Sequence, residues 1–394
     1  MYIDYTPEQK ALKQEIRTYM ADLMTPELED ELHGMEAGGP LYHAALQKMG
    51  ADGWLGIGWK KEYGGQGRSP IEEFIFYDEV QRAGFPVPFL TLTTVGPTLA
   101  KYGSDAQRAQ FLGPILAGKV HFAIGYTEPG AGTDLAGLRT TAVRDGDEYV
   151  INGQKIFTSL ANFADYLWLA AKTDPDKKHD GISVLIVPMN AEGVEQTRIR
   201  TLGDNQTSAV YLNNVRVPAE NIVLGENKGW KLVTSQLNHE RVALNPVGPI
   251  ARFLTELQRW AKQTTTPSGE RVIDRPWVRH NLAELYAQAE IVKLMNWQQA
   301  WKIQQRELSP ADASALKVYG SEFFVRAYRA MMEILGAAGP LKLGEPGAAL
   351  QGRIETYYRS ILVLTFGGGT NEVQRDIIAM MGLGMPRPPY GQGA

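Results

Sequence analysis

The sequence predicts an α+β chain in which a helical region comes first, an antiparallel β region second and a set of helices last. In residues 1–119 apolar side chains recur at helical spacing. Between residues 120 and 227, β-branched and aromatic residues alternate with polar ones, as they do in strands. In residues 228–394 the helical period returns. These three ranges are the domains that we expect.

Each region carries its own local signals. Leu12, Ile16 and Met20 lie on one face of a first helix, and the glycine-rich run YGGQG breaks the helical pattern at residues 63–67. In the β region, Asp145-Gly146 and Asn152-Gly153 are typical of short hairpin turns. Beyond residue 228, the period predicts helices over the ranges Trp230–Lys262, Trp277–Gln304, Pro310–Leu335 and Leu350–Leu383.

Composition excludes several classes of protein. With 394 residues, 44% of them hydrophobic, the chain can bury more than one core and is not disordered in composition. A net charge of −4 without long charged runs argues against nucleic acid as a partner. The absence of cysteine excludes disulfides, thiolate catalysis and cysteine-ligated metals, so redox chemistry requires a bound cofactor. The histidines, His239 included, show no metal-ligand spacing. No signal peptide or membrane-spanning run is evident, so we expect a cytoplasmic protein that uses no membrane.

The run from Tyr126 to Asp134, YTEPGAGTD, is the first candidate binding segment. Its glycines would let backbone N–H groups approach a polar ligand closely, although a plain glycine-rich turn explains the same residues. A Rossmann phosphate loop would have to open a helix. The run that follows, TTAVRDGDEYVINGQK, reads as a hairpin instead. We therefore do not expect NAD binding of that type.

Glu240 is the second candidate. Trp230, Val233, Leu237, Glu240 and Leu244 form one stripe of a helix, so a carboxylate interrupts an apolar face. Burial would raise its pKa, which suits a base that removes a proton from carbon. The alternative is a structural carboxylate paired with Arg241 or another arginine. The spacing alone leaves both interpretations open.

Five motifs in order resemble the acyl-CoA dehydrogenase family along nearly the whole chain. They are KEYGGQG (61–67), YTEPGAGTDLAGLRT (126–140), DEYVINGQKIFTSLA (147–161), VRVPAENIVLGENKGW (215–230) and GGGTNEVQRDIIA (367–379). The resemblance implies an N-terminal helical domain, a central antiparallel β domain and a C-terminal four-helix bundle. It also implies FAD as the cofactor and α,β-dehydrogenation of an acyl-CoA to a trans-2-enoyl-CoA, with an electron-transferring flavoprotein as acceptor.

The resemblance also implies the site residues. Flavin or acyl-CoA would be lined by Ile124, Tyr126, Thr127, Gly132 and Thr133, and the isoalloxazine would be covered by Phe157, Thr158 and Ser159. The Ser159 hydroxyl would lie near flavin N5. Thr370 would bind the cofactor, and Arg241 and the backbone N–H of Gly368 would bind substrate.

The catalytic base occupies one of two positions in this family. Most members carry a glutamate directly before the Gly-Thr of the C-terminal motif, where this chain has Gly368. A minority, including isovaleryl-type and long-chain enzymes, carry it at the position that matches Glu240. The resemblance therefore implies that Glu240 takes the α proton while hydride leaves for FAD N5.

Two departures from the homotetrameric members concern assembly. Residues 269–281, GERVIDRPWVRHN, lack the Arg-x-x-Phe-Gly loop that grips a neighbouring subunit's flavin, and Glu333 stands where those members have a glutamine. A carboxylate beside a pyrophosphate is unfavourable. The same departures occur in α-type subunits of bacterial heterotetramers that oxidise steroid side-chain thioesters. We therefore expect a homologous second subunit, an α2β2 assembly and a bulky or branched acyl group.

Two other functions fit the same family. The chain could be a non-catalytic or cofactor-completing subunit in which Glu240 is structural. It could also be another flavoenzyme on this fold, of the nitroalkane oxidase or flavin monooxygenase type. The intact TEPGAGTD and IFTS segments argue against the first.

Overall fold

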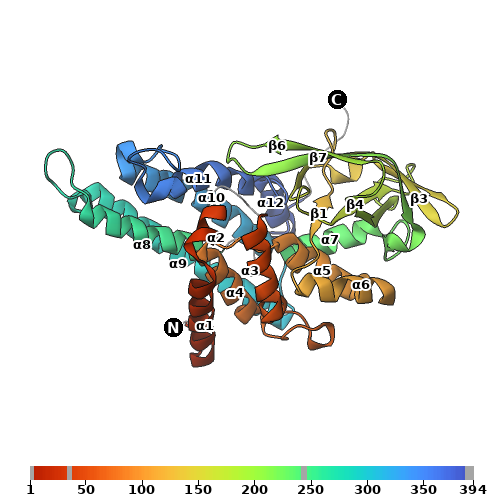
Figure 1. Ribbon diagram of the computed structural model, residues 1–394, viewed down its shortest axis with the longest axis horizontal. Helices are drawn as coiled ribbons and strands as arrows, with labels where there is room; N and C mark the ends of the chain where they lie inside the picture. The colour runs from red at the N-terminus through yellow and green to blue at the C-terminus, as the bar shows by residue number, and fades with distance from the viewer. Residues whose placement is uncertain (1–3, 33–37, 241–245, 387–394) are drawn as a thin grey trace.

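The computed structural model describes residues 4–32, 38–240 and 246–386, and for residues 237–240 it describes the backbone alone. Helices at the N-terminus, a β region in the middle and helices at the C-terminus follow one another along the chain (Figure 1). This order confirms the predicted fold class. Within the described ranges, no helix combines the length and the apolar character that crossing a membrane requires.

The N-terminal helices start at well-defined caps. Thr6, Ser69 and Ser104 each form a capping box with the residue three positions later, which satisfies the first free N–H groups of their helices. A π-helical turn, Leu90–Val95, runs directly into α5. The helices are α1 (Pro7–Leu23), α2 (Pro26–Glu31), α3 (Pro40–Ala51), α4 (Pro70–Ala83), α5 (Gly96–Tyr102) and α6 (Asp105–Leu116).

The central region forms one sheet with the strand order β6-β7-β3-β2-β4-β5-β8, and β1 pairs with β4. The strands are β1 (Phe122–Gly125), β2 (Thr141–Asp145), β3 (Glu148–Ser159), β4 (Tyr166–Lys172), β5 (Ile182–Pro188), β6 (Val194–Arg200), β7 (Gln206–Pro218) and β8 (Ile222–Val223). Most neighbours are antiparallel, as predicted. However, β4 runs parallel to both β1 and β2, so the sheet is mixed.

The two hairpin signals have different outcomes. Asp145-Gly146 does lie at the β2–β3 hairpin, where Gly146 adopts a φ of 63°. The Asn152-Gly153 prediction is wrong, because both residues lie inside β3 at a shift in its register with β7. A Cβ at Gly153 would lie 2.4 Å from Thr140 Oγ1, so this glycine permits the close approach of a neighbouring segment.

The C-terminal helices are α7 (Gly229–Glu240), α8 (Gly248–Gln263), α9 (Pro276–Gln305), α10 (Pro310–Leu335), α11 (Arg353–Ser360) and α12 (Asn371–Ile377). The expected helix Trp230–Lys262 is therefore two helices. The range Leu350–Leu383 is also divided, since Leu350 and Gln351 have positive φ angles and Gly368 and Gly369 form a turn before α12. The spacing of apolar residues alone does not predict these breaks between helices.

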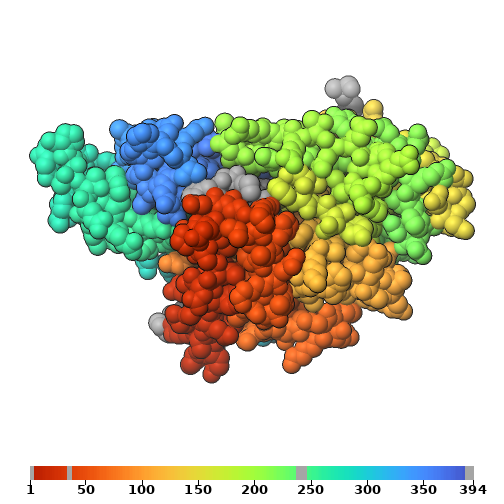
Figure 2. Space-filling model, viewed as in Figure 1, coloured from red at the N-terminus to blue at the C-terminus, as the bar shows by residue number. Residues whose placement is uncertain are grey.

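The hydrophobic cores join the regions. One cluster unites the N-terminal helices with Phe122, Trp168 and Val184 of the sheet and with Leu232 of α7. A second fills the space between α8, α9, α10 and α11. Figure 2 shows the N-terminal domain packed against both the β region and the C-terminal helices.

Candidate functional site

A buried ion pair fixes the glycine-rich loop 126–134 beneath β3. Lys155 Nζ lies 2.8 Å from Glu128 Oε1 and also donates a hydrogen bond to the carbonyl oxygen of Tyr126. Glu128 accepts further hydrogen bonds from the backbone N–H groups of Arg139 and Thr140 and from the Thr140 hydroxyl. The Glu128 carboxylate therefore ties the loop to β3 and to residues 139–140.

The charges of this pair follow from its surroundings. Burial raises the pKa of Glu128, but the Lys155 ammonium and the donated hydrogen bonds outweigh it, so the net shift is downward. Burial lowers the pKa of Lys155 to about 8, against the opposing attraction of Glu128. The loop thus rests on an ionised pair at neutral pH.

The tip of the loop is open. Gly130, Gly132 and Thr133 are exposed, and no described atom lies within 4 Å of the position that a Cβ would take at either glycine. Ile124 and Thr127, at the start of the segment, are half-buried, and the carbonyl of Thr127 accepts the N–H of Ile156 in β3. The loop tip can therefore approach a large polar ligand without steric obstruction.

The end of β3 presents Phe157 and Ser159 to the outside. A β-bulge falls between Lys155 and Thr158, and Phe157 within it has a φ of 55° and is 62% exposed. A left-handed backbone at a bulky residue is strained and is found most often at functional positions. The bulge reorients this side chain away from the core.

The residues paired with this end of β3 add polar groups that sequence reasoning missed. Ser159 pairs with Thr207 and Thr158 pairs with Ser208, so each pair shares one face of the sheet. The hydroxyls of Thr158, Thr207 and Ser208 are buried and find no hydrogen-bond partner among the described residues. Unsatisfied hydroxyls of this kind are a reason to expect a bound polar group.

A chain of hydrogen bonds connects the same loop to α7. The Tyr126 hydroxyl donates to Gln236 Oε1 and accepts from the indole N–H of Trp168, 3.1 Å away. Gln236 Nε2 in turn donates to the hydroxyl of Thr98 in α5. Gln236 is buried and lies one helical turn before Glu240. It was missed because a lone glutamine in a helix carries no sequence signal.

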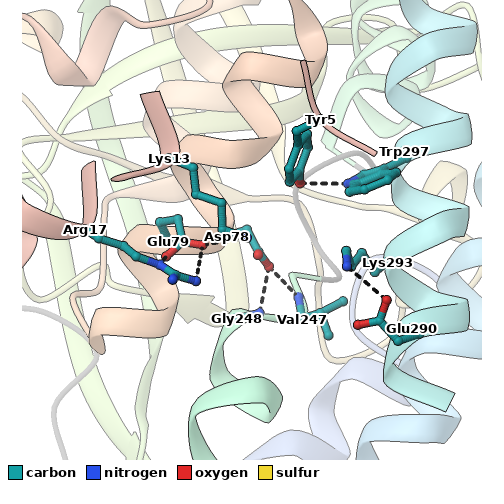
Figure 3. A network of polar contacts seen from close by, with 10 residues as sticks. All are labelled: Tyr5, Lys13, Arg17, Asp78, Glu79, Val247, Gly248, Glu290, Lys293 and Trp297. Carbon is teal, nitrogen blue, oxygen red and sulfur yellow. Dashed lines mark hydrogen bonds and ion pairs between the residues drawn. The ribbon is translucent and has the colours of Figure 1, made fainter. Parts of the chain in front are cut away.

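The helix α7 is described as far as Glu240, so the candidate base lies on that helix. Its side chain lies outside the described residues, as does Arg241. Just before α8, Asp78 Oδ1 accepts hydrogen bonds from the N–H groups of Val247 and Gly248, each at 2.7 Å (Figure 3). Asp78 of α4 thereby caps the beginning of α8, which has no side-chain cap of its own.

The residue beside Asp78 makes a separate ion cluster. Glu79 is buried and contacts Lys13 Nζ at 3.1 Å and Arg17 Nε at 2.5 Å, both from α1 (Figure 3). Burial and the neighbouring Glu79 raise the pKa of Asp78, whereas the hydrogen bonds from Gly248 and Val247 lower it, and the net shift is upward. Glu79 thus ties α4 to α1, and Asp78 ties α4 to α8.

The turn that carries Gly368 is held on α10. Lys317 is buried and donates to the carbonyl of Gly369 and to Asn371 Oδ1, each at 2.7 Å. Gly368 is exposed with a φ of 67°, and Thr370 caps α12 by accepting the N–H of Val373. Lys317 was also missed, because lysine is rarely buried and a lone lysine in a helix is therefore expected at the surface.

Glu333 is exposed at the C-terminal end of α10. Its Oε1 lies 3.2 Å from Arg329 Nε, in an ion pair across one helical turn. Glu333, which departs from the homotetrameric pattern, therefore places a carboxylate at the surface, where Arg329 partly balances it.

Comparisons with known proteins cover all three regions of the chain. Three family models match: the N-terminal domain of acyl-CoA dehydrogenase over residues 6–119, the middle domain over 123–215 and the C-terminal domain over 227–383. The chain is 55% identical over 397 residues to acyl-CoA dehydrogenase FadE26 of Mycobacterium tuberculosis, with 98% of this chain and 99% of that protein covered. It is 49% identical to FadE29 of the same organism, with 99% and 100% covered.

Solved structures agree. The crystal structure of the ChsE4-ChsE5 complex from Mycobacterium tuberculosis contains a chain that matches with a TM-score of 0.93 and 56% identity, covering 98% of this chain and 100% of that one. The Tcur3481-Tcur3483 steroid ACAD matches with a TM-score of 0.93 and 49% identity, covering 98% and 100%. With matches of this extent in all three regions, the chain belongs to the acyl-CoA dehydrogenase family.

Proposed function

We propose that this protein is an FAD-dependent dehydrogenase that introduces a trans-2 double bond into a bulky or branched acyl-CoA, with Glu240 as the base. The observation that carries the proposal is the connection from Tyr126 to Gln236. It joins the glycine-rich loop to α7, which carries Glu240 one turn further on. A base on this turn lies next to the segment where the family binds its ligands.

The residues around the loop suit a flavin. Ser159 and Thr207 present hydroxyls on one face of the sheet, and the loop tip with Gly130 and Gly132 is unobstructed. Ser159 would donate a hydrogen bond to the ring, and Thr127, Thr133 and Thr370 are further polar contacts that we assign to the cofactor. Thr158 faces the opposite side from Ser159, so we expect it to contribute through its backbone.

The reaction needs the thioester polarised while the α proton is removed. We assign that role to the backbone N–H of Gly368, whose left-handed turn is held by Lys317. Glu240 takes the α proton, and Arg241 contacts the substrate. FAD, when bound, would supply the acceptor for the hydride of the β carbon. Gly368 has no side chain, so the glutamate that most members carry at this position is absent. Glu240 is therefore the base that we assign.

The substrate and the partner are proposed from the relatives. The Tcur3481-Tcur3483 relative is described as a steroid ACAD, and the ChsE4-ChsE5 relative is described as a complex. We infer a bulky acyl group of the steroid side-chain class and a homologous second subunit that completes each flavin site. An electron-transferring flavoprotein is the acceptor that we expect.

The test is anaerobic flavin reduction by acyl-CoA in a single turnover, with this chain assembled with its homologous second subunit. Glu240→Gln should slow it at least about a hundredfold, the low end for loss of a general base. Glu226→Gln serves as the control, because this exposed carboxylate precedes α7 and, among the described residues, contacts Tyr149 and Arg144. Flavin content should be the same in both variants. A wild-type rate in Glu240→Gln would show that the base lies elsewhere, as in a subunit without catalytic function.

A further inference from the structure

A cavity of about 630 Å³ lies between α4, α5, the segment 58–63 and the end of α9. Aromatic and apolar side chains make up most of its wall, among them Trp59, Tyr63, Phe74, Tyr77, Pro97 and Ile303. Its volume falls within the range of about 300–1,000 Å³ that is typical of small-molecule sites. The cavity can accommodate a rigid, largely apolar molecule.

Glu73 contributes the one carboxyl group among the described residues that line this cavity. A Cβ at Gly58 would lie 2.5 Å from the Glu73 carboxyl carbon, so the lack of a side chain at residue 58 leaves room for this group. Within the described part of the chain, the carboxyl group of Glu73 has no hydrogen bond or ion pair. A carboxyl group without a partner in an apolar wall is costly unless a ligand satisfies it.

The cavity lies on the flank of α5, next to the proposed active site. Thr98 of α5 points toward α7 and accepts the hydrogen bond from Gln236. Thr93, Pro97 and Ala100 of the same helical segment line the cavity. The cavity and the hydrogen bond from Gln236 of α7 to Thr98 therefore share one helical segment.

We propose that this cavity holds the fused-ring part of the acyl group, and that Glu73 determines specificity by hydrogen bonding to an oxygen on those rings. The proposal rests on the proposed function and names its substrate class: a steroid-like acyl-CoA with a keto or hydroxyl group far from the thioester. Rigid rings lose little conformational freedom on binding, so the apolar wall supplies affinity. The oxygen at Glu73 supplies selectivity over plain alkyl chains, which leave the carboxyl group without a partner.

Protonation gives the site a characteristic pH dependence. Burial raises the pKa of Glu73 to about 7, so below that pH the group can donate a hydrogen bond to a ketone. Above that pH, the ionised carboxylate and the ketone oxygen would both be hydrogen-bond acceptors, so no hydrogen bond could form between them. The other titratable groups in the wall are Lys60, Tyr63, Tyr77 and Lys101. Lys60 pairs with Glu62, and burial holds the pKa of Tyr77 well above its usual value, so neither changes charge near pH 7.

Equilibrium dialysis of a radiolabelled steroid ketone, 4-androstene-3,17-dione, against the purified full-length protein tests the site without turnover. Wild type should bind about three- to tenfold more tightly at pH 6 than at pH 8, the value of about one hydrogen bond. Glu73→Gln should bind with little pH dependence, because an amide donates at both pH values. Glu73→Leu should bind weakly at both.

The matched control is Glu72→Gln, which changes a neighbouring carboxylate engaged with Ser69 and Arg68. It should bind the ketone as wild type does. Gly58→Ala should weaken binding, because its new methyl group displaces the carboxyl group of Glu73. Absence of ketone binding, or equal affinity in wild type and Glu73→Leu, would overturn the proposal.

Competition distinguishes the rings of the substrate from a separate ligand. A steroid-ring acyl-CoA should displace the ketone, whereas octanoyl-CoA should not. If the ring-bearing acyl-CoA reduces the flavin yet leaves the ketone bound, the cavity is not the acyl subsite. If no acyl-CoA reduces the flavin although the ketone binds with the expected pH dependence, the proposed function fails while the ligand class of the cavity stands.

Discussion

Lys155 and Glu128 form an ion pair inside the protein, with 2.8 Å between Nζ and Oε1 and side chains that are 0% and 8% exposed. The pair joins the middle of β3 to the glycine-rich loop, so the two segments that we assign to the flavin share one support. Four hydrogen bonds besides the ion pair converge on these two side chains.

Lys155→Met should lower the free energy of unfolding by about 3–5 kcal/mol, because it leaves Glu128 buried without its counter-charge. Lys178→Met is the matched control in the same loop region, since Lys178 pairs with Asp134 at 2.9 Å but both side chains are more than half exposed. It should cost about 0–1 kcal/mol. Denaturant titration gives both values. Equal losses in the two variants would contradict the structural role of the buried pair.

Asp78→Ala should destabilise the protein by about 1–2 kcal/mol, the usual range for loss of a helix cap. The variant removes the acceptor for the N–H groups of Val247 and Gly248 at the start of α8. Asp78→Asn keeps an oxygen at that position and should lose less. Thermal unfolding of the three proteins decides the matter, and identical curves for the two variants would argue that the negative charge matters rather than the cap.

Ser159→Ala should shift the flavin reduction potential or slow flavin reduction, because the hydroxyl is expected to bond to the ring. Thr197→Ala, an exposed hydroxyl on β6 of the same sheet, is the control. Spectroelectrochemical titration and stopped-flow reduction measure the two quantities. No change in either would remove Ser159 from the proposed flavin contacts.

Expressed alone, this chain should bind FAD weakly, because Glu333 and residues 269–281 depart from the pattern that completes a neighbour's flavin site. With a homologous second subunit it should form an α2β2 tetramer with two flavins. Native mass together with flavin content tests this expectation. A stable homotetramer of this chain with four tightly bound flavins would refute the heteromeric assembly and leave Glu240 unaffected.

The order of helical and β regions was predictable because the period of apolar residues is a local property of the sequence. The parallel pairing of β4 with β1 and β2 was not, since nothing local encodes which strand lies beside which. Asn152-Gly153 was misread for a related reason: the same dipeptide suits a tight turn and a bulge, and only the partner strand distinguishes them.

The candidate site was also predictable from the sequence only in part. The loop 126–134 and the segment 157–159 were found from motifs. Lys155 and Gln236 support the loop, and Lys317 supports the turn at Gly368, through contacts between segments far apart in the chain. Single polar residues inside helices and strands carry no periodic signal. The bonds that they make become visible only when the fold brings their partners together.

The pairing of Ser159 with Thr207 has a consequence for how the protein is made. β3 leaves the ribosome well before β7, yet its final register depends on β7. Contacts between distant segments must pay the entropy of closing a long loop before they form. The end of β3 therefore stays unpaired while the middle of the chain is being synthesised. The nascent protein acquires the face that we assign to the cofactor only after β7 has joined the sheet.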